Sequence, residues 1–328
     1  MLTLFIHIFI TTMLPIFSLV LIGVLFDKKF HSDGHTLSKI NFFILLPPFI
    51  FRALYKAHYT LESLNVLYCG LLIVFFLWAI ATVFCHFSNY DYKKMQIYRN
   101  SVMFTNCGNI GAAVTTFVFS NMPYVVDGET PYLHQALLTM VTLLVINNIL
   151  SNTWGLYSTG VGIMTAHDSI RTVFHMPMVY VVPLVFLAKS LPYDLTSFFL
   201  WPVIDLFANA FVAISMITLG LQINRTPHNF FSKEVLNPTF ARLILGPLVA
   251  MLSVYIFTIC FQPFQPIEAQ TIVIAYAIPT AVNIALMAYE LKNNAEFATE
   301  IVMSTTLLSS ITLPIVILLA YYMYPITP

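Results

Sequence analysis

Long apolar stretches separated by short polar segments repeat along the whole chain. Each stretch is about 20 residues long, the length of helix needed to cross the hydrocarbon core of a bilayer. We therefore predict an all-α polytopic membrane protein. Its ten transmembrane helices are expected at approximately 4–26, 37–56, 63–88, 97–119, 132–156, 171–189, 198–222, 238–261, 267–291 and 298–323.

Composition supports this class. Hydrophobic residues make up 59% of the 328 residues, charged residues only 9%, and the mean hydropathy is +0.84, whereas an average soluble domain is about 25% charged. Lys+Arg and Asp+Glu both number 14, so the chain lacks the basic excess typical of nucleic-acid binding. We expect the lipid bilayer as a partner, and no nucleic acid.

The basic residues are distributed unevenly between the two sides of the predicted membrane protein. Short cytoplasmic loops are enriched in Lys and Arg. The side expected to be cytoplasmic carries Lys28, Lys29, Lys39, Lys93, Lys94, Arg99, Arg171, Arg225, Lys233, Arg242 and Lys292, and the other side carries Arg52, Lys56 and Lys189. This distribution predicts that both termini lie outside, in a plasma or inner membrane.

The ten predicted spans divide into two sets of five. An odd number of spans in each set reverses the direction of the second set, as in inverted-repeat transporters. We expect an N-terminal repeat at 1–156, a short cytosolic linker at 157–170 and an inverted C-terminal repeat at 171–328. The fourth span of each repeat is interrupted near its centre, by the "NCGNIG" segment in the first and by Pro279 in the second.

These matched interruptions predict a binding site. A helix broken in hydrocarbon exposes backbone groups, which is tolerated only inside protein or beside a water-filled cavity, and paired breaks in two repeats indicate a transporter site. The second half-helices, expected to start near Ala112 and Thr280, would direct their positive N-terminal ends at an anion. Asn106 and Asn283 could complete the site because a carboxamide both donates and accepts hydrogen bonds.

The remaining residues of the predicted substrate site lie beside these asparagines. Gly108 and Gly111 are expected to let the chain turn and a ligand approach the backbone, and Pro279 and Thr280 form the partner break. Asn109 is expected either to contact the ligand or to cap the break. The alternative is a Gly-lined helix contact in which Asn residues hydrogen-bond between helices.

Asp205 is the carboxylate placed furthest inside a predicted span. An ionised carboxylate in hydrocarbon costs roughly 2.5–3.5 kcal/mol, so Asp205 is expected to face protein or water. Asn209 lies one turn further on the same face, so the two could form a coupling site for Na+ or H+. Alternatively, Asp205 lies near the outer interface and pairs with Lys189 or water.

Polar residues also cluster in the fifth and tenth spans. Hydrogen bonds between helices would explain both clusters. Thr305 and Ser309 could also line the pocket, and the fifth-span cluster could contact substrate. The clusters comprise Asn147, Asn148, Ser151 and Asn152 in the fifth span, and Thr305, Ser309 and Thr312 in the tenth.

The order and spacing of these motifs resemble the auxin efflux carrier family, within the bile acid/sodium symporter-like superfamily. The resemblance covers the whole chain and rests on "NCGNIGAA", "IPTAVNIALMAYEL", "STTLLSSITLPIVIL", "MLPIFSLVLIGVLF" and "INFFILLPPFIF". It implies ten helices with outside termini, a scaffold and a transport bundle, and crossing broken helices that hold an organic anion. It also implies elevator-like movement and suggests a homodimer. Ala113 replaces a usual Pro, and the seventh span lacks the common mid-helix Pro.

No HExxH, GxSxG or P-loop pattern is present, and no convergent catalytic or metal-ligating set is visible. We therefore expect no enzyme activity, cofactor or metal site. The main prediction is a secondary carrier of a small organic anion, bound where the fourth and ninth spans cross. The alternatives are a Na+- or H+-coupled symporter of bile-acid-like or dicarboxylate substrates, and a transporter-like channel or sensor.

Overall fold

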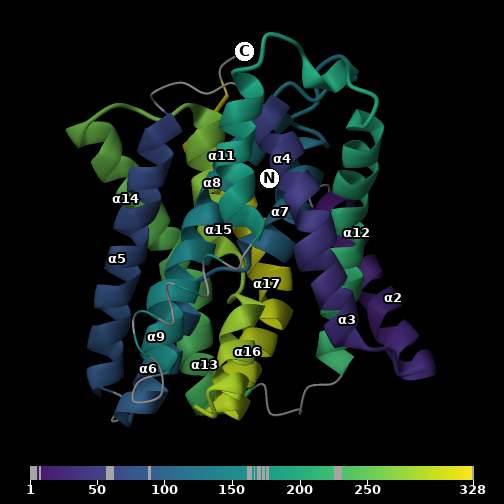
Figure 1. The fold of residues 1–328 in the computed structure, drawn as a ribbon. Helices are drawn as coiled ribbons and strands as arrows, with labels where there is room; N and C mark the ends of the chain where they lie inside the picture. The colour runs from purple at the N-terminus through teal and green to yellow at the C-terminus, as the bar shows by residue number, and fades with distance from the viewer. Residues whose placement is uncertain are drawn as a thin grey trace.

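The computed structural model describes residues 6, 9–56, 63–87, 90–160, 165, 167, 171, 174, 177–224 and 231–326. These residues form helices joined by short connections (Figure 1). Within them there are no β-strands, only two isolated β-bridges. The predicted all-α class is confirmed.

The helices fall in every range where the sequence predicts a span. The first half contains η1 (Phe9–Met13), α2 (Leu14–Phe30), α3 (Gly34–Lys39), η2 (Ile40–Leu45), α4 (Leu46–Lys56), α5 (Ser63–Phe87), α6 (Tyr92–Met103), η3 (Cys107–Gly111), α7 (Ala112–Phe119), α8 (Leu133–Leu150), η4 (Ser151–Gly155) and α9 (Leu156–Thr159). The second half contains α11 (Pro177–Lys189), η5 (Leu195–Ser197), α12 (Trp201–Asn224), α13 (Lys233–Phe240), η6 (Ala241–Leu245), α14 (Gly246–Cys260), α15 (Pro266–Ala277), α16 (Val282–Glu290) and α17 (Ala295–Met323).

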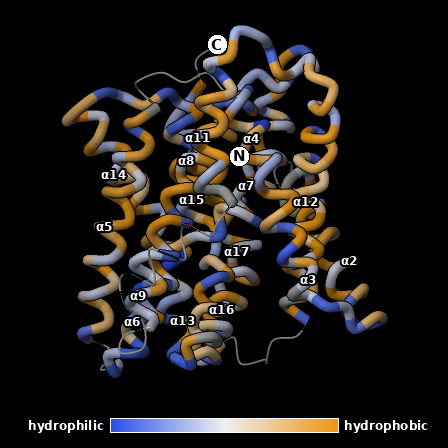
Figure 2. Tube along the Cα trace, in the orientation of Figure 1, coloured by the Kyte–Doolittle hydropathy of each residue, from blue (hydrophilic) through white to orange (hydrophobic). Residues whose placement is uncertain are grey.

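Six of the described helices are long and apolar enough to cross a membrane: Phe9–Phe30, Leu64–His86, Leu133–Thr159, Trp201–Leu221, Lys233–Cys260 and Ala295–Met323. Figure 2 shows hydrophobic residues along α5, α12 and α14. These helices support an integral membrane protein, whereas the ten-span inverted repeat is not confirmed. Four predicted spans, 37–56, 97–119, 171–189 and 267–291, have no counterpart among these six, and two of them, 97–119 and 267–291, are each broken into two helices. Much of the predicted linker 157–170, and Arg225, lie outside the described residues.

The helices pack in two groups. In the four-helix group, α2 packs along α12, and α4 packs against α11 and α12. The crossover group comprises α5, α6, α7, α8, α14, α15, α16 and α17. Figure 1 shows α5 and α14 along one side of the molecule and α2 and α12 along the other.

Two glycines allow α2 and α12 to approach closely. A Cβ atom on Gly23 would lie 2.1 Å from the Ile217 carbonyl oxygen, and one on Gly220 would lie 2.1 Å from the Val20 carbonyl oxygen. Real Cβ atoms essentially never come this close to backbone. The four-helix group is therefore held together by a contact that only glycine permits at these two positions.

Both predicted helix breaks are present in the crossover group. A residue before proline is disfavoured in the helical conformation, and Ile278, which precedes Pro279, ends α15 with φ −69° and ψ 147°. Phe104 ends α6 with a similarly extended backbone, at φ −102° and ψ 126°, although no proline follows it. Both end residues are fully buried.

The two extended segments cross and pair with each other. Thr105 and Thr280 form an antiparallel bridge. The Asn106 N–H donates to the Pro279 carbonyl over 2.9 Å, and the Ala281 N–H donates to the Phe104 carbonyl over 3.0 Å. Backbone groups released by one break are thus satisfied by the other, which explains how two broken helices persist in an apolar interior.

Candidate substrate site

The break in the first of these helices precedes the glycines. Gly111 has φ −62° and ψ −46°, an ordinary helical conformation, and Gly108 lies within the π-helical turn η3. The prediction that the chain turns at these glycines is therefore wrong, because the non-helical residues are 104–106. Gly111 instead permits close packing, since a Cβ atom there would lie 3.0 Å from Ile278 Cδ1 and from Met140 Sδ.

The half-helices begin close to the predicted residues. The first has a π-helical turn, η3, from Cys107 and continues as α7 from Ala112, and the second starts as α16 at Val282, two residues after Thr280. Asn106 is the N-cap of η3, and its Oδ1 accepts a hydrogen bond from the Asn109 N–H over 3.3 Å. The capping role expected for Asn109 is therefore performed by Asn106.

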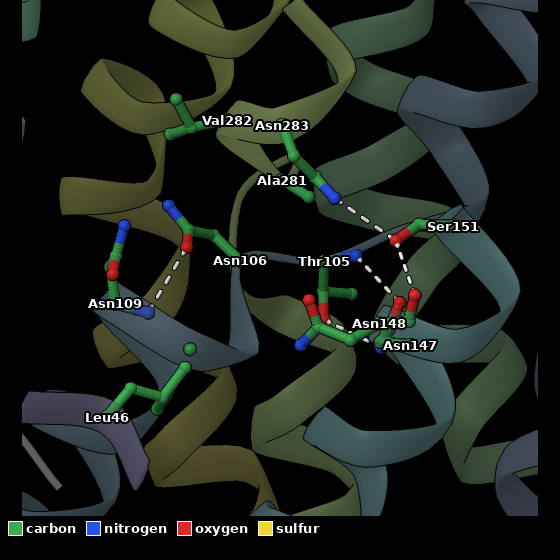
Figure 3. Close-up of a pocket in the computed structure, with 11 residues that line it drawn as sticks. Leu46, Thr105, Asn106, Asn109, Asn147, Asn148, Ser151, Ala281, Val282 and Asn283 are labelled. Atoms are coloured by element: carbon green, nitrogen blue, oxygen red, sulfur yellow. Dashed lines mark hydrogen bonds between the residues drawn. The ribbon is translucent and has the colours of Figure 1, made fainter. Parts of the chain in front are cut away.

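A cavity of about 60 Å³ lies beside the crossing (Figure 3). One water molecule requires roughly 10–15 Å³ on this measure, so the cavity could hold a few water molecules or a small carboxylate. None of the described residues that line it is charged. They are Leu46, Thr105, Asn106, Gly108, Asn109, Asn147, Asn148, Ser151, Ala281, Val282 and Asn283.

Asn106 and Asn283 each leave one amide atom unpaired among the described residues. Asn106 is 6% exposed, and its buried Nδ2 has no hydrogen-bond partner. Asn283 donates through Nδ2 to Ser151 Oγ over 3.1 Å, as Figure 3 shows, and its buried Oδ1 has no partner. Leaving a buried polar atom unpaired costs about 1–3 kcal/mol. Both atoms are therefore favourable contacts for a bound molecule.

Helix α8 and the adjoining η4 supply a polar wall that the sequence analysis interpreted mainly as interhelical hydrogen bonding. That interpretation is confirmed for Asn147, whose Oδ1 accepts from the Thr105 N–H and whose Nδ2 donates to Thr105 Oγ1, both over 3.2 Å. However, Asn147, Asn148 and Ser151 also line the cavity. The sequence signal for this wall was the close spacing of these polar residues, about one helical turn, within one predicted apolar span.

Asn109 connects the cavity to the four-helix group. Its Oδ1 accepts from Asn41 Nδ2 over 3.2 Å. Asn41, in η2, also donates to Ser215 Oγ of α12 over 2.8 Å. The sequence analysis identified neither Asn41 nor Ser215, because each is a single polar residue whose partner is distant in the sequence.

Four other predicted site residues lie away from the cavity wall. Pro279 and Thr280 form the crossing segment itself, and the Thr280 N–H donates to Thr305 Oγ1 over 3.2 Å. Thr305 therefore supports the crossing. Ser309 lies beside a different cavity between α2, η3, α7, α12 and α17.

Asp205 and Asn209 are brought together by an arginine. Arg52 Nε lies 3.0 Å from Asp205 Oδ1, and Arg52 Nη1 donates to Asn209 Oδ1 over 2.5 Å. The Arg52 and Asp205 side chains are 30% and 34% exposed. Arg52 and Asn209 line a separate cavity of about 330 Å³ between the two helix groups. Neither Asp205 nor Asn209 lines the cavity at the crossing.

Arg242 lies in the protein interior, so its assignment to the cytoplasmic loops is wrong. It is 0% exposed. Its guanidinium donates to three backbone carbonyls: from Nε to Ile278 over 3.1 Å, from Nη1 to Val102 over 2.7 Å and from Nη2 to Tyr276 over 2.7 Å. An ionisable residue within a span is a functional-site hypothesis by default, and that signal was overlooked because Arg242 lies close to the predicted helix end.

Comparison with known proteins identifies the family. Residues 176–317 match a family model described as "Membrane transport protein". This segment contains Arg242, Pro279 and Asn283, whereas Asn106 precedes it. No curated protein matches the chain. Residues 176–317 belong to the membrane transport family of the auxin efflux carrier type, which confirms the family predicted from the sequence.

Proposed function

We propose that the protein is a secondary carrier of a small organic anion, which binds in the cavity at the crossing of the two broken helices. Membership of a membrane transport family and six long apolar helices support a membrane transporter. One observation carries the site. Two amide atoms that have no hydrogen-bond partner among the described residues, Asn106 Nδ2 and Asn283 Oδ1, belong to residues that line one cavity.

The helix ends at this cavity favour an anion. The first N–H groups of a helix have no partner within that helix, and its N-terminus carries roughly half a positive elementary charge. Gly108 lies in the first turn of η3, Val282 and Asn283 lie in the first turn of α16, and all three line the cavity. A carboxylate could therefore be held by helix ends and amides without a charged side chain.

The two unpaired atoms are of opposite kinds. Asn106 Nδ2 is a donor and suits a carboxylate oxygen, whereas Asn283 Oδ1 is an acceptor and suits an O–H or N–H group. We infer that the preferred substrate is a carboxylate that also carries a hydrogen-bond donor, such as a hydroxy acid.

Packing between helices is consistent with two inverted repeats and an elevator-type movement. α5 packs on α6 as α14 packs on α15, and α2 packs on α12 as α4 packs on α11. These related contacts support a scaffold formed by the four-helix group and a moving bundle formed by the crossover group. With ten spans, both termini lie outside.

Thermal stabilisation by ligands tests the site in purified protein. We expect malate to raise Tm more than succinate, and lactate more than propionate, because each first member adds a hydroxyl donor. The stabilisation should be lost in Asn106→Ala and Asn283→Ala. Removing a hydrogen bond to a charged group costs about 1.5–3 kcal/mol, which is roughly a 10- to 150-fold loss of affinity.

Asn121→Ala is a matched control. Asn121 follows α7, and its Nδ2 donates to the Phe117 carbonyl over 2.7 Å, so the ligand response should be retained. Unchanged ligand affinity in both cavity variants would overturn the site assignment. Uptake of the stabilising acid into proteoliposomes should saturate with concentration, whereas conductance without saturation would indicate a channel.

A further inference from the structure

Three backbone carbonyls converge on Arg242 where α6 and α15 end. The last carbonyls of a helix have no partner within that helix and carry partial negative charge. Val102 lies in the last turn of α6, Tyr276 lies in the last turn of α15, and Ile278 follows α15. All three carbonyls accept from one guanidinium, over 2.7–3.1 Å. One cation therefore serves the negative ends of both broken helices.

The surroundings of the guanidinium fit it closely. Gly246 lies one turn beyond Arg242, and a Cβ atom there would lie 2.4 Å from the Tyr276 carbonyl oxygen and 3.4 Å from Arg242 Cζ. Glycine at this position therefore allows the carbonyl and the cation to meet. The ring of Tyr276 also lies 5.9 Å from Arg242 Cζ, within reach of a cation–π interaction.

In carriers with broken helices, a coupling Na+ or H+ is coordinated by backbone carbonyls of the unwound segments and by the C-terminal ends of the half-helices. We propose that Arg242 is a built-in cation that takes the place of a coupling Na+, so that substrate binds and moves without Na+. A coupling ion must bind and leave in each cycle. An arginine is covalently attached and stays charged, so this position cannot be emptied and refilled.

The placement of a cation at these carbonyls follows from the hydrogen bonds of Arg242 alone. Only the claim that substrate moves without Na+ rests on the proposed carrier function. The acidic residue considered for coupling, Asp205, is paired with Arg52 at 3.0 Å and does not line the cavity at the crossing. Among the described residues, therefore, the converging carbonyls are the best candidate for a Na+ position, and a guanidinium already fills it.

Sodium binding to the purified wild-type protein tests the proposal without any substrate. We expect no saturable binding of radioactive Na+, and no rise in Tm in NaCl relative to choline chloride at equal ionic strength. Saturable Na+ binding to the wild type would overturn the proposal. A failure of the proposed carrier function would be seen separately, as an absent ligand response that depends on Asn106 and Asn283.

Removing the guanidinium provides a second test. Arg242→Ala should lower Tm, and methylguanidinium should restore part of the loss because it can occupy the vacated position. Arg242→Lys should lower Tm less than Arg242→Ala does, because lysine keeps the positive charge. It should still lower Tm, because lysine lacks the several N–H donors of the guanidinium. Arg52→Ala is the matched control and should show no recovery.

An Arg242→Ala variant with the wild-type Tm and no response to methylguanidinium would contradict the proposal. If Arg242→Ala does not fold, the sodium measurement on the wild type decides alone.

Discussion

Asn41 Nδ2 donates to Asn109 Oδ1 over 3.2 Å, and this hydrogen bond joins the two helix groups beside the proposed substrate cavity. Asn41 belongs to η2, which packs with the four-helix group, and Asn109 belongs to the first turn of the half-helix η3–α7. Movement of one group past the other would have to break this bond. The bond is therefore positioned to make such a movement sensitive to what occupies the cavity.

A double-mutant cycle measures this link. Asn41→Ala and Asn109→Ala should be non-additive in their effects on the free energy of unfolding, with a coupling of about 0.5–1.5 kcal/mol, the net value of one hydrogen bond. The pair Asn41→Ala and Asn121→Ala should be additive because these side chains are not bonded to each other. Additivity in the first cycle would show that the bond contributes nothing.

Gly220→Ala should destabilise the four-helix group strongly. The added methyl group would meet the Val20 carbonyl at 2.1 Å, and overpacking of this kind costs about 1–3 kcal/mol or more. Gly108→Ala is the matched control, because its methyl group would meet only Leu144 Cδ1, at 3.7 Å. Thermal unfolding in detergent should show a clear loss of Tm in the first variant and little in the second. Equal Tm values would contradict the close helix crossing.

Thr305→Val should weaken the crossing without removing a cavity residue. The variant leaves the buried Thr280 N–H without its acceptor, at a cost of about 1–3 kcal/mol. Thr312→Val is a suitable control because the Thr312 hydroxyl makes only a long contact, 3.5 Å, to the Leu308 carbonyl. Tm should fall in Thr305→Val and stay near the wild-type value in the control. A Thr305→Val variant as stable as the wild type would contradict this role.

Asp205→Asn should have little effect on either stability or ligand binding. The Arg52–Asp205 pair is partly exposed, and such pairs contribute about 0–1 kcal/mol. Ligand-induced stabilisation should therefore be retained. A Na+ gradient should drive uptake in neither protein, and a proton gradient should affect the variant and the wild type equally. A gradient response present in the wild type and lost in this variant would identify Asp205 as a coupling residue.

The sequence located one helix break better than the other. Pro279 restricts the residue before it, so the second break is encoded locally. The first break has no such signal, because Gly108 and Gly111 suit a helix as well as a turn. The break is stabilised from elsewhere: Asn147 of α8 accepts from the Thr105 N–H, and Arg242 of η6 donates to the Val102 carbonyl in the last turn before the break. Local reasoning therefore placed this break several residues too late.

The candidate site was predictable to a similar extent. Asn106 and Asn283 were identified from the matched breaks, and both line the cavity. The wall from α8 and the bond to Asn41 depend on which helices pack together, and spacing along the chain does not specify that. Arg242 was misplaced because charge counting at an approximate helix boundary cannot distinguish a helix end from a buried turn.

The fixed charge of Arg242 has an electrical consequence. If the crossover group moves across the bilayer, it carries this positive charge with it, and a bound monovalent anion cancels the charge. Moving one elementary charge through a membrane potential of 100 mV changes the free energy by about 2.3 kcal/mol. The potential would then act mainly on the return of the empty carrier, so voltage would set the rate of the step in which no substrate is carried.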